Sequence, residues 1–335
     1  MKVAIVGIGY WGPNLVRNFL NNDSVDTVIC YDLDKNRLDH VLKQFPIIKI
    51  ANDYQEILDN SKIDAVVIST SVSSHFSLAK KALESGKHVL VEKPLTANCK
   101  DAETLNKIAR REKLKLMVDH IFVYNGAVRK IKDIIKSGEI GKIMYYDAVR
   151  INLGLFQHDV NVIWDLAIHD LSIMEFLLPE KPVAISAVGI GHYDKQENIS
   201  YLTLFFKSSC IGHIHVNWLA PVKIRRLLIG GDKKMIVFDD VEPVEKIRVY
   251  DKGVVATTQE GIYKTLIQYR TGDMYAPSFD TTESLAIVAN EFINAIKNDT
   301  EPLTNGEAGI HMIKILEAAE KSIKNKGCII ELDQT

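Results

Sequence analysis

Short apolar runs alternate with longer segments of helical periodicity through the first 118 residues of the chain. The runs contain few polar residues, as is typical of strands buried on both faces of a parallel sheet, and lie at 3–6, 27–31, 65–69, 88–91 and 115–118. A shorter strand is expected at 46–50, and helical patterns separate the runs at 14–21, 35–45, 53–59, 75–85 and 101–112. This alternation predicts an α/β fold with a doubly wound parallel sheet and helices on both of its faces.

The pattern changes beyond residues 120–125, where we place a domain boundary. Strand-like stretches now follow one another with few helices between them, at 143–150, 183–189, 200–206, 210–218, 225–229, 235–239 and 246–250. They predict an α+β domain with an open, mainly antiparallel sheet. Helices are expected at 126–137, 162–178, 283–298 and 306–325. The predicted domains are residues 1–122 and 123–335, with the C-terminal helices able to pack back on the first domain.

Apolar and polar residues alternate along residues 213–218, and this alternation has two explanations. A large uncovered sheet face usually marks an oligomer interface, which would make the protein a homodimer or homotetramer through its C-terminal sheet. The same alternation follows if one face of the strand packs on the core and the other meets solvent. Both explanations stay open at this point.

Composition and charge narrow the class of protein. The chain has 335 residues and a formal net charge of −2, without any lysine- or arginine-rich block, so we expect no nucleic-acid or anionic-membrane partner. The four cysteines lack metal-ligand spacing and are typical of reduced thiols. The sequence enters its first strand without a charged leader, and it has no apolar run of membrane-spanning length. We therefore expect a cytoplasmic protein.

The first apolar run leads into a glycine-rich turn of the form G-x-G-x-x-G at Gly7, Gly9 and Gly12. Gly7 permits a tight turn, Gly9 lets the backbone approach a pyrophosphate, and Gly12 lets the next helix pack closely on the strand. The helix starts near Pro13 and directs unpaired N–H groups toward the phosphates. A strand, turn and helix without any ligand is the alternative. The other residues of the turn are also predicted cofactor contacts: Ile8, Tyr10 and Trp11.

The second apolar run ends in Asp32, twenty residues beyond Gly12, where an acidic side chain binds the ribose hydroxyls of the adenosine. A carboxylate there repels the 2′-phosphate of NADP, and the next two residues, Leu33 and Asp34, supply no arginine to bind it. The sequence therefore predicts a Rossmann domain that prefers NAD to NADP.

A lysine, Lys93, directly follows another buried strand and precedes Pro94. The ends of parallel strands form the edge where ligands bind in open α/β sheets. An ammonium group held there can polarise a substrate hydroxyl or carbonyl and stabilise an alkoxide. A surface lysine beside a turn is the alternative.

Asp165 and His169 lie four residues apart in a predicted helix, so their side chains project from one face. An aspartate placed this way can orient an imidazole, which titrates in the range of a general base. A core histidine with a nearby helix-capping acid is the alternative. Asp170 points to a different helix face and no third ligand has suitable spacing, so we expect no metal site. His213 and His215 share a strand face as a core or interface pair.

Together these motifs resemble the glucose-fructose oxidoreductase, inositol dehydrogenase and MocA-type family of NAD(P)-dependent sugar oxidoreductases. The resemblance spans nearly the whole chain and rests on the glycine turn, Glu92-Lys93-Pro94, residues 165–169, Glu283-Ser-Leu and Glu291-Phe-Ile. It implies a Rossmann domain followed by an open-sheet α/β domain, dimers or tetramers built through that sheet, and a cis peptide at Pro94.

The resemblance also implies roles for single residues. Lys93 matches the lysine that contacts the reacting hydroxyl and the nicotinamide ribose, and His169 matches the proton acceptor, with Asp165 as its acidic partner. His75 matches a cofactor-loop histidine in a T-P-x-x-x-H pattern, although this chain has Ser71 where proline is usual. Further cofactor contacts are expected from Thr70 and Glu92.

The substrate expected from the resemblance is a nucleotide-linked sugar. Residues 160–172 are similar to the corresponding stretch in family members of surface-polysaccharide pathways, which oxidise nucleotide-linked sugars at C3. The expected substrate is therefore a UDP-N-acetylhexosamine or its uronic acid. A carboxylate or diphosphate of the substrate could meet Arg150 and Asn152, and a solvated strand residue is the alternative for each of them. Further contacts are expected from Asn161 and Trp164. A free polyol or monosaccharide dehydrogenase is the alternative, and a non-catalytic NAD-binding regulator is the alternative of another class.

Overall fold

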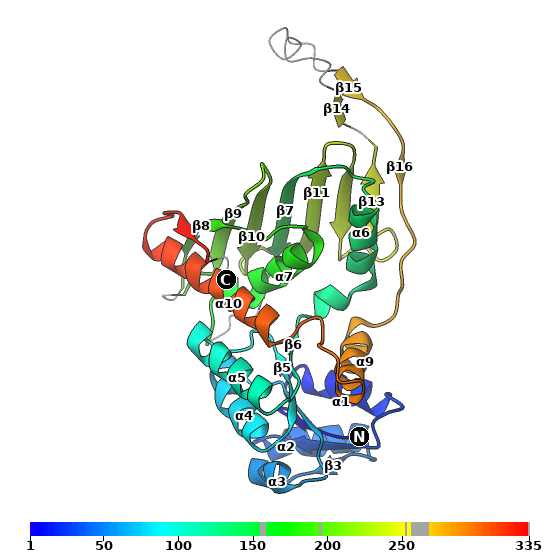
Figure 1. The fold of residues 1–335 in the computed structure, drawn as a ribbon, viewed down its shortest axis with the longest axis vertical. Helices are drawn as coiled ribbons and strands as arrows, with labels where there is room; N and C mark the ends of the chain where they lie inside the picture. The colour runs from blue at the N-terminus through cyan, green and yellow to red at the C-terminus, as the bar shows by residue number, and fades with distance from the viewer. Residues whose placement is uncertain (155–158, 194–195, 252, 256–267, 334–335) are drawn as a thin grey trace. The chain divides into compact units, whose positions relative to one another are not determined.

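The computed structural model of the chain describes residues 1–154, 159–193, 196–251, 253–255 and 268–333 (Figure 1). The chain forms two compact units. The first contains Met1–Tyr124 and Thr282–Glu317, and the second contains Asn125–Thr281 and Ala318–Thr335. The chain therefore completes most of the second unit before residues 282–317 return to the first.

The first unit is built on a six-stranded sheet in which every pair of neighbours is parallel. Its strands are nearly devoid of polar residues because both faces of the sheet are covered. The order is β3-β2-β1-β4-β5-β6, so its direction reverses between β1 and β4, where such sheets bind ligands at the carboxyl ends of their strands. The predicted doubly wound sheet is confirmed, with strands β1 Lys2–Val6, β2 Thr27–Tyr31, β3 Lys49–Ile50, β4 Ala65–Ile68, β5 His88–Glu92 and β6 Leu116–Asp119.

Helices follow the strands of this unit, and several begin at side-chain caps. Asp34, Asp53 and Asn98 each accept a backbone N–H from the first turn of their helix, which satisfies a donor that has no partner within the helix. The helices are α1 Gly12–Leu20, α2 Lys35–Gln44, α3 Tyr54–Asp59, α4 Val72–Glu84 and α5 Cys99–Arg111, followed by a 3₁₀ turn at Ile121–Tyr124.

The helix α9, Ser284–Lys297, belongs to the first unit although it comes late in the sequence. Glu283 just before it accepts two hydrogen bonds from the guanidinium of Arg17 on α1, each 2.7 Å long. Asn18 donates a third to the same carboxylate. The glutamate of the Glu283-Ser-Leu motif thus fixes α9 on α1. The last helix, α10 Gly306–Lys324, continues from the first unit into the second.

The second unit is built on a nine-stranded sheet in the order β16-β13-β12-β11-β7-β10-β9-β8-β17. Only β7 and β10 pair in parallel, and the other neighbours are antiparallel, which confirms the predicted mainly antiparallel sheet. The strands are β7 Ile143–Ile151, β8 Ala184–Ile190, β9 Ile199–Phe205, β10 Ile211–Asn217, β11 Ile224–Gly231, β12 Met235–Asp239, β13 Ile247–Tyr250, β16 Met274–Tyr275 and β17 Ile330–Glu331. A separate hairpin pairs β14 Gly253–Val255 with β15 Gln268–Arg270.

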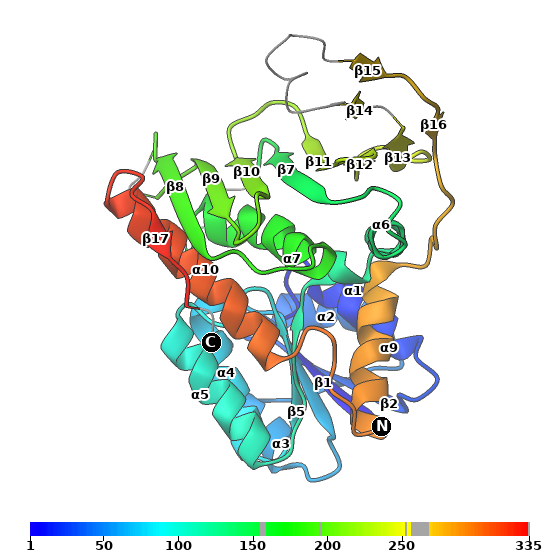
Figure 2. The same ribbon diagram turned by 45° about the horizontal axis from the view of Figure 1, so that its top comes forward.

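Helices α6 Gly126–Lys136 and α7 Ile168–Leu177 lie on one side of this sheet (Figure 2). The predicted helix at 162–178 differs from the structure at its start, because Ile163–Ala167 forms a π-helical turn. Along β10, Ile214 and Val216 are buried, whereas His213 and His215 are partly exposed. Among the described helices of the chain, none combines the length and apolarity of a membrane span.

Candidate active site

The glycine turn has the geometry that a dinucleotide-binding loop requires at each of its three glycines. Gly7 has a φ of +95°, and a Cβ there would lie 2.7 Å from the carbonyl oxygen of Ser69. A Cβ on Gly12 would lie 2.7 Å from the carbonyl oxygen of Gly7, so neither position accepts a larger residue. Over Gly9 a Cβ would meet only Arg37, with its Nη1 at 3.6 Å. Gly7 and Gly12 are therefore tightly packed, whereas Gly9 has open space beside it, where the backbone can approach a pyrophosphate.

The other side chains of the turn divide into one that packs and two that reach solvent. Ile8 is buried, whereas Tyr10 and Trp11 are exposed and form an edge-to-face pair with ring centroids 5.5 Å apart. Both aromatic rings thus flank the start of α1, whose first-turn N–H groups lack helical partners. Tyr10 and Trp11 are therefore exposed beside the helix start, where cofactor contacts are predicted for them.

Asp32 lies at the end of β2, beside the glycine turn. Its carboxylate accepts the backbone N–H of Ile8 at 2.6 Å and that of Asp34 at 2.8 Å. The Nη1 atom of Arg37, on the first turn of α2, lies 3.7 Å from Asp32 Oδ2. The sequence prediction considered only the next two residues and so missed this arginine, which helical spacing brings back over Asp32.

His75 and Thr70 form part of the protein framework beneath Lys93. The His75 ring is buried, with Nδ1 2.9 Å from the Pro94 carbonyl oxygen and Nε2 3.1 Å from that of Thr70. The Thr70 hydroxyl lies 2.7 Å from that of Ser74. The Lys93–Pro94 peptide is cis, as expected. The buried ring of His75 bridges the Thr70 loop and the loop that carries Lys93, and its direct contact with the cofactor stays a prediction.

Glu92 and Asp119 end the neighbouring strands β5 and β6 and are register partners. Residues paired in this way point to the same face of a sheet, so their side chains are neighbours, and we call them the acid pair. Burial raises the pKa of Glu92 to about 7, against the opposing charge of Lys93. Burial and the neighbouring Glu92 hold the pKa of Asp119 well above its usual value. Sequence reasoning missed Asp119, and only the pairing of its strand with β5 could have indicated it.

The second unit contributes Asp165 and His169. In residues 161–170 these are the two side chains that are partly exposed, while the other eight are buried. The amide of Ile168 donates to the Ile163 carbonyl, which produces the wider π turn around Asp165. Such turns are frequent at functional sites. Asp165 Oδ2 accepts a hydrogen bond from Trp218 Nε1 at 3.1 Å, so a buried indole fixes the carboxylate on the accessible side.

Arg150 lies in a buried ion pair of the second unit, and its contact with substrate stays a prediction. Its side chain is buried on β7, and its Nε and Nη2 donate to the two carboxylate oxygens of Asp170 at 2.7 and 2.9 Å. The side-chain alternation of β7 turns Arg150 toward α7, which carries Asp170. A bidentate ion pair of this kind satisfies both charges inside the second unit.

Asn161 and Trp164 are also hydrogen-bonded within the protein, and their contacts with substrate stay predictions. Asn161 is buried, and its oxygen accepts the N–H of Ile163 at 3.1 Å, while its amide donates to Glu197 and Glu320. Trp164 Nε1 donates to Glu320 at 2.8 Å. These contacts fix the start of the π turn. Asn152, by contrast, follows β7 and stays partly exposed.

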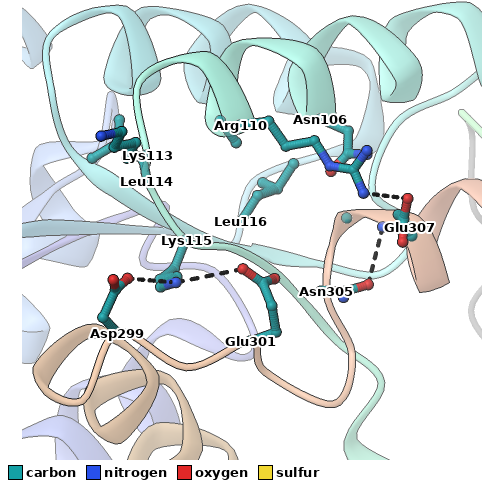
Figure 3. A pocket seen from close by; sticks show the side chains of 12 residues that line it. Asn106, Arg110, Lys113, Leu114, Lys115, Leu116, Asp299, Glu301, Asn305 and Glu307 are labelled. Atoms are coloured by element: carbon teal, nitrogen blue, oxygen red, sulfur yellow. Dashed lines mark hydrogen bonds and ion pairs between the residues drawn. The ribbon is translucent and has the colours of Figure 1, made fainter.

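A cavity of about 480 Å³ in the first unit is lined in part by Lys115 (Figure 3). Lys115 comes just before β6, whereas Lys93 follows the end of β5. Lys115 Nζ lies 2.9 Å from Asp299 and 3.4 Å from Glu301, and Arg110 pairs with Glu307. Since strands β5 and β6 are parallel, the two places are at opposite edges of the sheet. The charges of this cavity neutralise one another and stabilise the start of β6.

Metal binding has no support in the described ranges, where no group of three or more His, Cys, Asp and Glu side chains could hold an ion. Each unit therefore contains its own set of candidate residues. In the first unit these are the glycine turn, Asp32, the acid pair and Lys93. In the second unit they are Asp165 and His169.

Comparison with known proteins identifies similar enzymes over most of the chain. It is 24% identical to myo-inositol 2-dehydrogenase of Thermotoga maritima, over 97% of each chain. It is 26% identical to UDP-N-acetylglucosamine 3-dehydrogenase of Acidithiobacillus ferrooxidans, over 74% of this chain and 75% of the other. A solved structure of the latter enzyme shares the fold, with a TM-score of 0.81 at 21% identity over 97% of this chain and 98% of that one.

Two family models match the two parts of the chain. Residues 1–120 match the oxidoreductase family with an NAD-binding Rossmann fold, and residues 128–237 match the GFO/IDH/MocA C-terminal domain. The predicted resemblance is thereby confirmed, and the chain belongs to the GFO/IDH/MocA family of oxidoreductases.

Proposed function

We propose that the protein is an NAD-dependent dehydrogenase that transfers a hydride between a sugar hydroxyl carbon and nicotinamide. One observation carries the proposal. The accessible side of residues 161–170 presents an acid and an imidazole, Asp165 and His169, in a chain that also has a lysine directly after β5. A bound NAD supplies the hydride acceptor at C4 of its nicotinamide ring.

The residues of the chain perform the remaining steps. His169 accepts the proton of the sugar hydroxyl, and Asp165 orients the imidazole and stabilises its charged form. The ammonium group of Lys93 stabilises negative charge that develops on the oxygen. The glycine turn and Asp32 hold the pyrophosphate and the adenosine ribose. Positioning contributes several kcal/mol to such a reaction, because it converts an encounter of two molecules into a step within one complex.

For the substrate we propose a UDP-linked N-acetylhexosamine or its uronic acid, oxidised at C3. Support comes from the Acidithiobacillus ferrooxidans relative, whose name gives UDP-N-acetylglucosamine as its substrate. Of the two predicted contacts with a substrate carboxylate or diphosphate, Asn152 is partly exposed. Arg150 forms an ion pair with Asp170. A free polyol is the second candidate, favoured by similarity to a myo-inositol dehydrogenase over 97% of each chain.

Fluorescence of reduced nicotinamide tests the function directly. The purified protein is mixed with NAD and then with UDP-sugars and free polyols, one at a time. A signal that develops with a UDP-N-acetylhexosamine or its uronic acid supports the proposal. A signal with polyols alone moves the assignment to the second candidate. If dinucleotide binds and no sugar reacts, the dehydrogenase assignment is wrong and a non-catalytic NAD-binding regulator becomes the better assignment.

We further propose that the cofactor is NAD in preference to NADP because Asp32 both repels a 2′-phosphate and engages Arg37. Asp32→Asn keeps an oxygen that can accept the Ile8 N–H while removing the charge. We expect its NAD-to-NADP affinity ratio to fall about tenfold or more, measured by quenching of protein fluorescence. Asp32→Asn combined with Arg37→Ala should lose the gain in NADP binding. An unchanged ratio in Asp32→Asn would contradict the ribose assignment.

A second copy of the chain is the proposed partner, bound through the nine-stranded sheet as a homodimer or homotetramer. Support comes from large apolar side chains exposed on neighbouring strands, Val188 and Ile190 on β8, Tyr201 on β9 and Ile211 on β10. Light scattering of the purified protein measures the mass of the particle, and a monomer would overturn this assignment. We also propose a cytosolic location, in keeping with four free cysteines, all within the described ranges.

A further inference from the structure

The acid pair lies at the ligand-binding edge of the parallel sheet. Glu92 and Asp119 are the last residues of β5 and β6, and they are direct register partners. Residues paired in this way point to the same face of a sheet. Asp119 is buried, with 3% of its surface exposed, whereas Glu92 is partly exposed beside Lys93. One carboxyl is thus shielded from solvent and the other can face a ligand.

Register pairing places the two carboxyl groups beside each other at the ends of neighbouring strands. Burial raises the pKa of both, which favours a state in which the pair keeps a proton. Two acids in contact also avoid simultaneous ionisation because their like charges repel. The proton belongs to the pair as a unit and not to either residue alone.

Charged and titratable groups surround the acid pair on several sides. Lys93 follows Glu92, and its backbone N–H donates to Glu92 Oε2 at 3.2 Å. Tyr124, in the 3₁₀ turn, feels the charge of Asp119, and its hydroxyl lies 3.1 Å from that of Thr304. His120 follows Asp119 in the sequence and is buried. The ring of His75, on α4, lies 2.9 Å from the carbonyl oxygen of Pro94, the residue after Lys93. Lys93 favours ionisation of the pair, and burial opposes it.

The strand order indicates which half of a dinucleotide meets the acid pair. Asp32 follows β2 on one side of the glycine turn of β1, and Glu92 is the last residue of β5 on the other side. A dinucleotide spans the edge at the point where the order reverses. If its adenosine lies over β2, its nicotinamide lies toward β4 and β5. That ring is cationic when oxidised and neutral when reduced.

We propose that Glu92 and Asp119 share one proton in the cofactor-free protein and release it to solvent when oxidised NAD binds, but not when NADH binds. The positive ring adds an attractive charge beside Glu92, so the doubly ionised acid pair becomes favourable and the proton leaves. Binding of NAD is therefore linked to pH and strengthens as pH rises through neutrality, whereas binding of NADH is not. Asp119 is a positioning residue that acts through Glu92. The release step rests on the proposed function, while the shared proton does not.

Infrared spectroscopy of the cofactor-free protein tests the shared proton by itself. A protonated carboxyl has a C=O stretching band that a carboxylate lacks. We expect this band at about pH 7 and its loss at higher pH in the native protein. Both Asp119→Asn and Glu92→Gln should remove it at neutral pH, and the exposed Asp59→Asn on α3 should retain it. Absence of the band in the native protein, or its persistence in both single variants, overturns the inference.

Calorimetric titration in phosphate and in Tris tests the release, since the two buffers differ in their heat of proton uptake. We expect up to one proton released for each NAD bound, none for NADH, and none for either ligand in Asp119→Asn, with Asp59→Asn as the matched control. Equal release for NAD and NADH, or release that persists in Asp119→Asn, overturns the linkage. If neither dinucleotide binds, the proposed function and the release step both fail, and the infrared band alone decides whether the proton is shared.

Discussion

Replacing Lys93 with Met is expected to lower kcat for sugar oxidation by about a thousandfold. Methionine has a similar length and no charge, so the variant removes the ammonium group that stabilises the developing alkoxide. Dinucleotide affinity should change only a few fold, because the glycine turn and Asp32 supply most of the binding contacts. Steady-state kinetics give kcat, and fluorescence quenching gives Kd for NAD.

A matched control for this change is Lys100→Met, at an exposed lysine on α5. It removes the same charge from the same unit at a residue for which no contact with cofactor or substrate is predicted. Full activity in both variants would remove Lys93 from the proposed mechanism. A large loss of NAD affinity with normal kcat would make Lys93 a binding residue instead.

His169→Asn is expected to lower kcat for oxidation by about a hundredfold to ten-thousandfold at neutral pH. The amide approximates the size of the imidazole but cannot accept the hydroxyl proton. In the native protein the rate should rise with pH as the imidazole loses its proton, and the variant should lack that limb of the profile. The pH dependence of kcat between about pH 5 and pH 9 measures both effects.

His40→Asn on α2 is the matched control, because His40 is exposed and belongs to the first unit. A native pH profile in His169→Asn would show that another group accepts the proton. The two proposed proton sites can also be separated. Asp119→Asn should remove the pH dependence of NAD binding and leave the His169 limb of turnover in place.

Local sequence patterns predicted the parts of the site that depend on backbone conformation. The glycine turn was visible because Gly7 and Gly12 must lack side chains, and the contacts a Cβ would make at both positions bear this out. Lys93 was indicated by its place directly after an apolar strand. Asp165 and His169 were paired by helical spacing, and they are the partly exposed residues of their segment even though a π turn forms the start of the expected helix.

Sequence patterns did not indicate the partners of polar residues when those partners are far away in the sequence. Arg150 was a candidate substrate contact because a guanidinium can bind a carboxylate or diphosphate, and in the structure Asp170 on α7 binds it inside the unit. Asn161 and Trp164 bind Glu320, on the last helix of the chain. No local pattern contains these partners.

The sequence by itself thus determined the two kinds of sheet, the glycine turn and the family, because strand burial, turn conformation and helical spacing are properties of neighbouring residues. The tertiary structure decided which polar groups are already bound within the protein. It paired Arg150 with Asp170 and brought Asp119 beside Glu92. The physical reason is that charge pairing and desolvation depend on distance in space, which the register of strands and the packing of helices set.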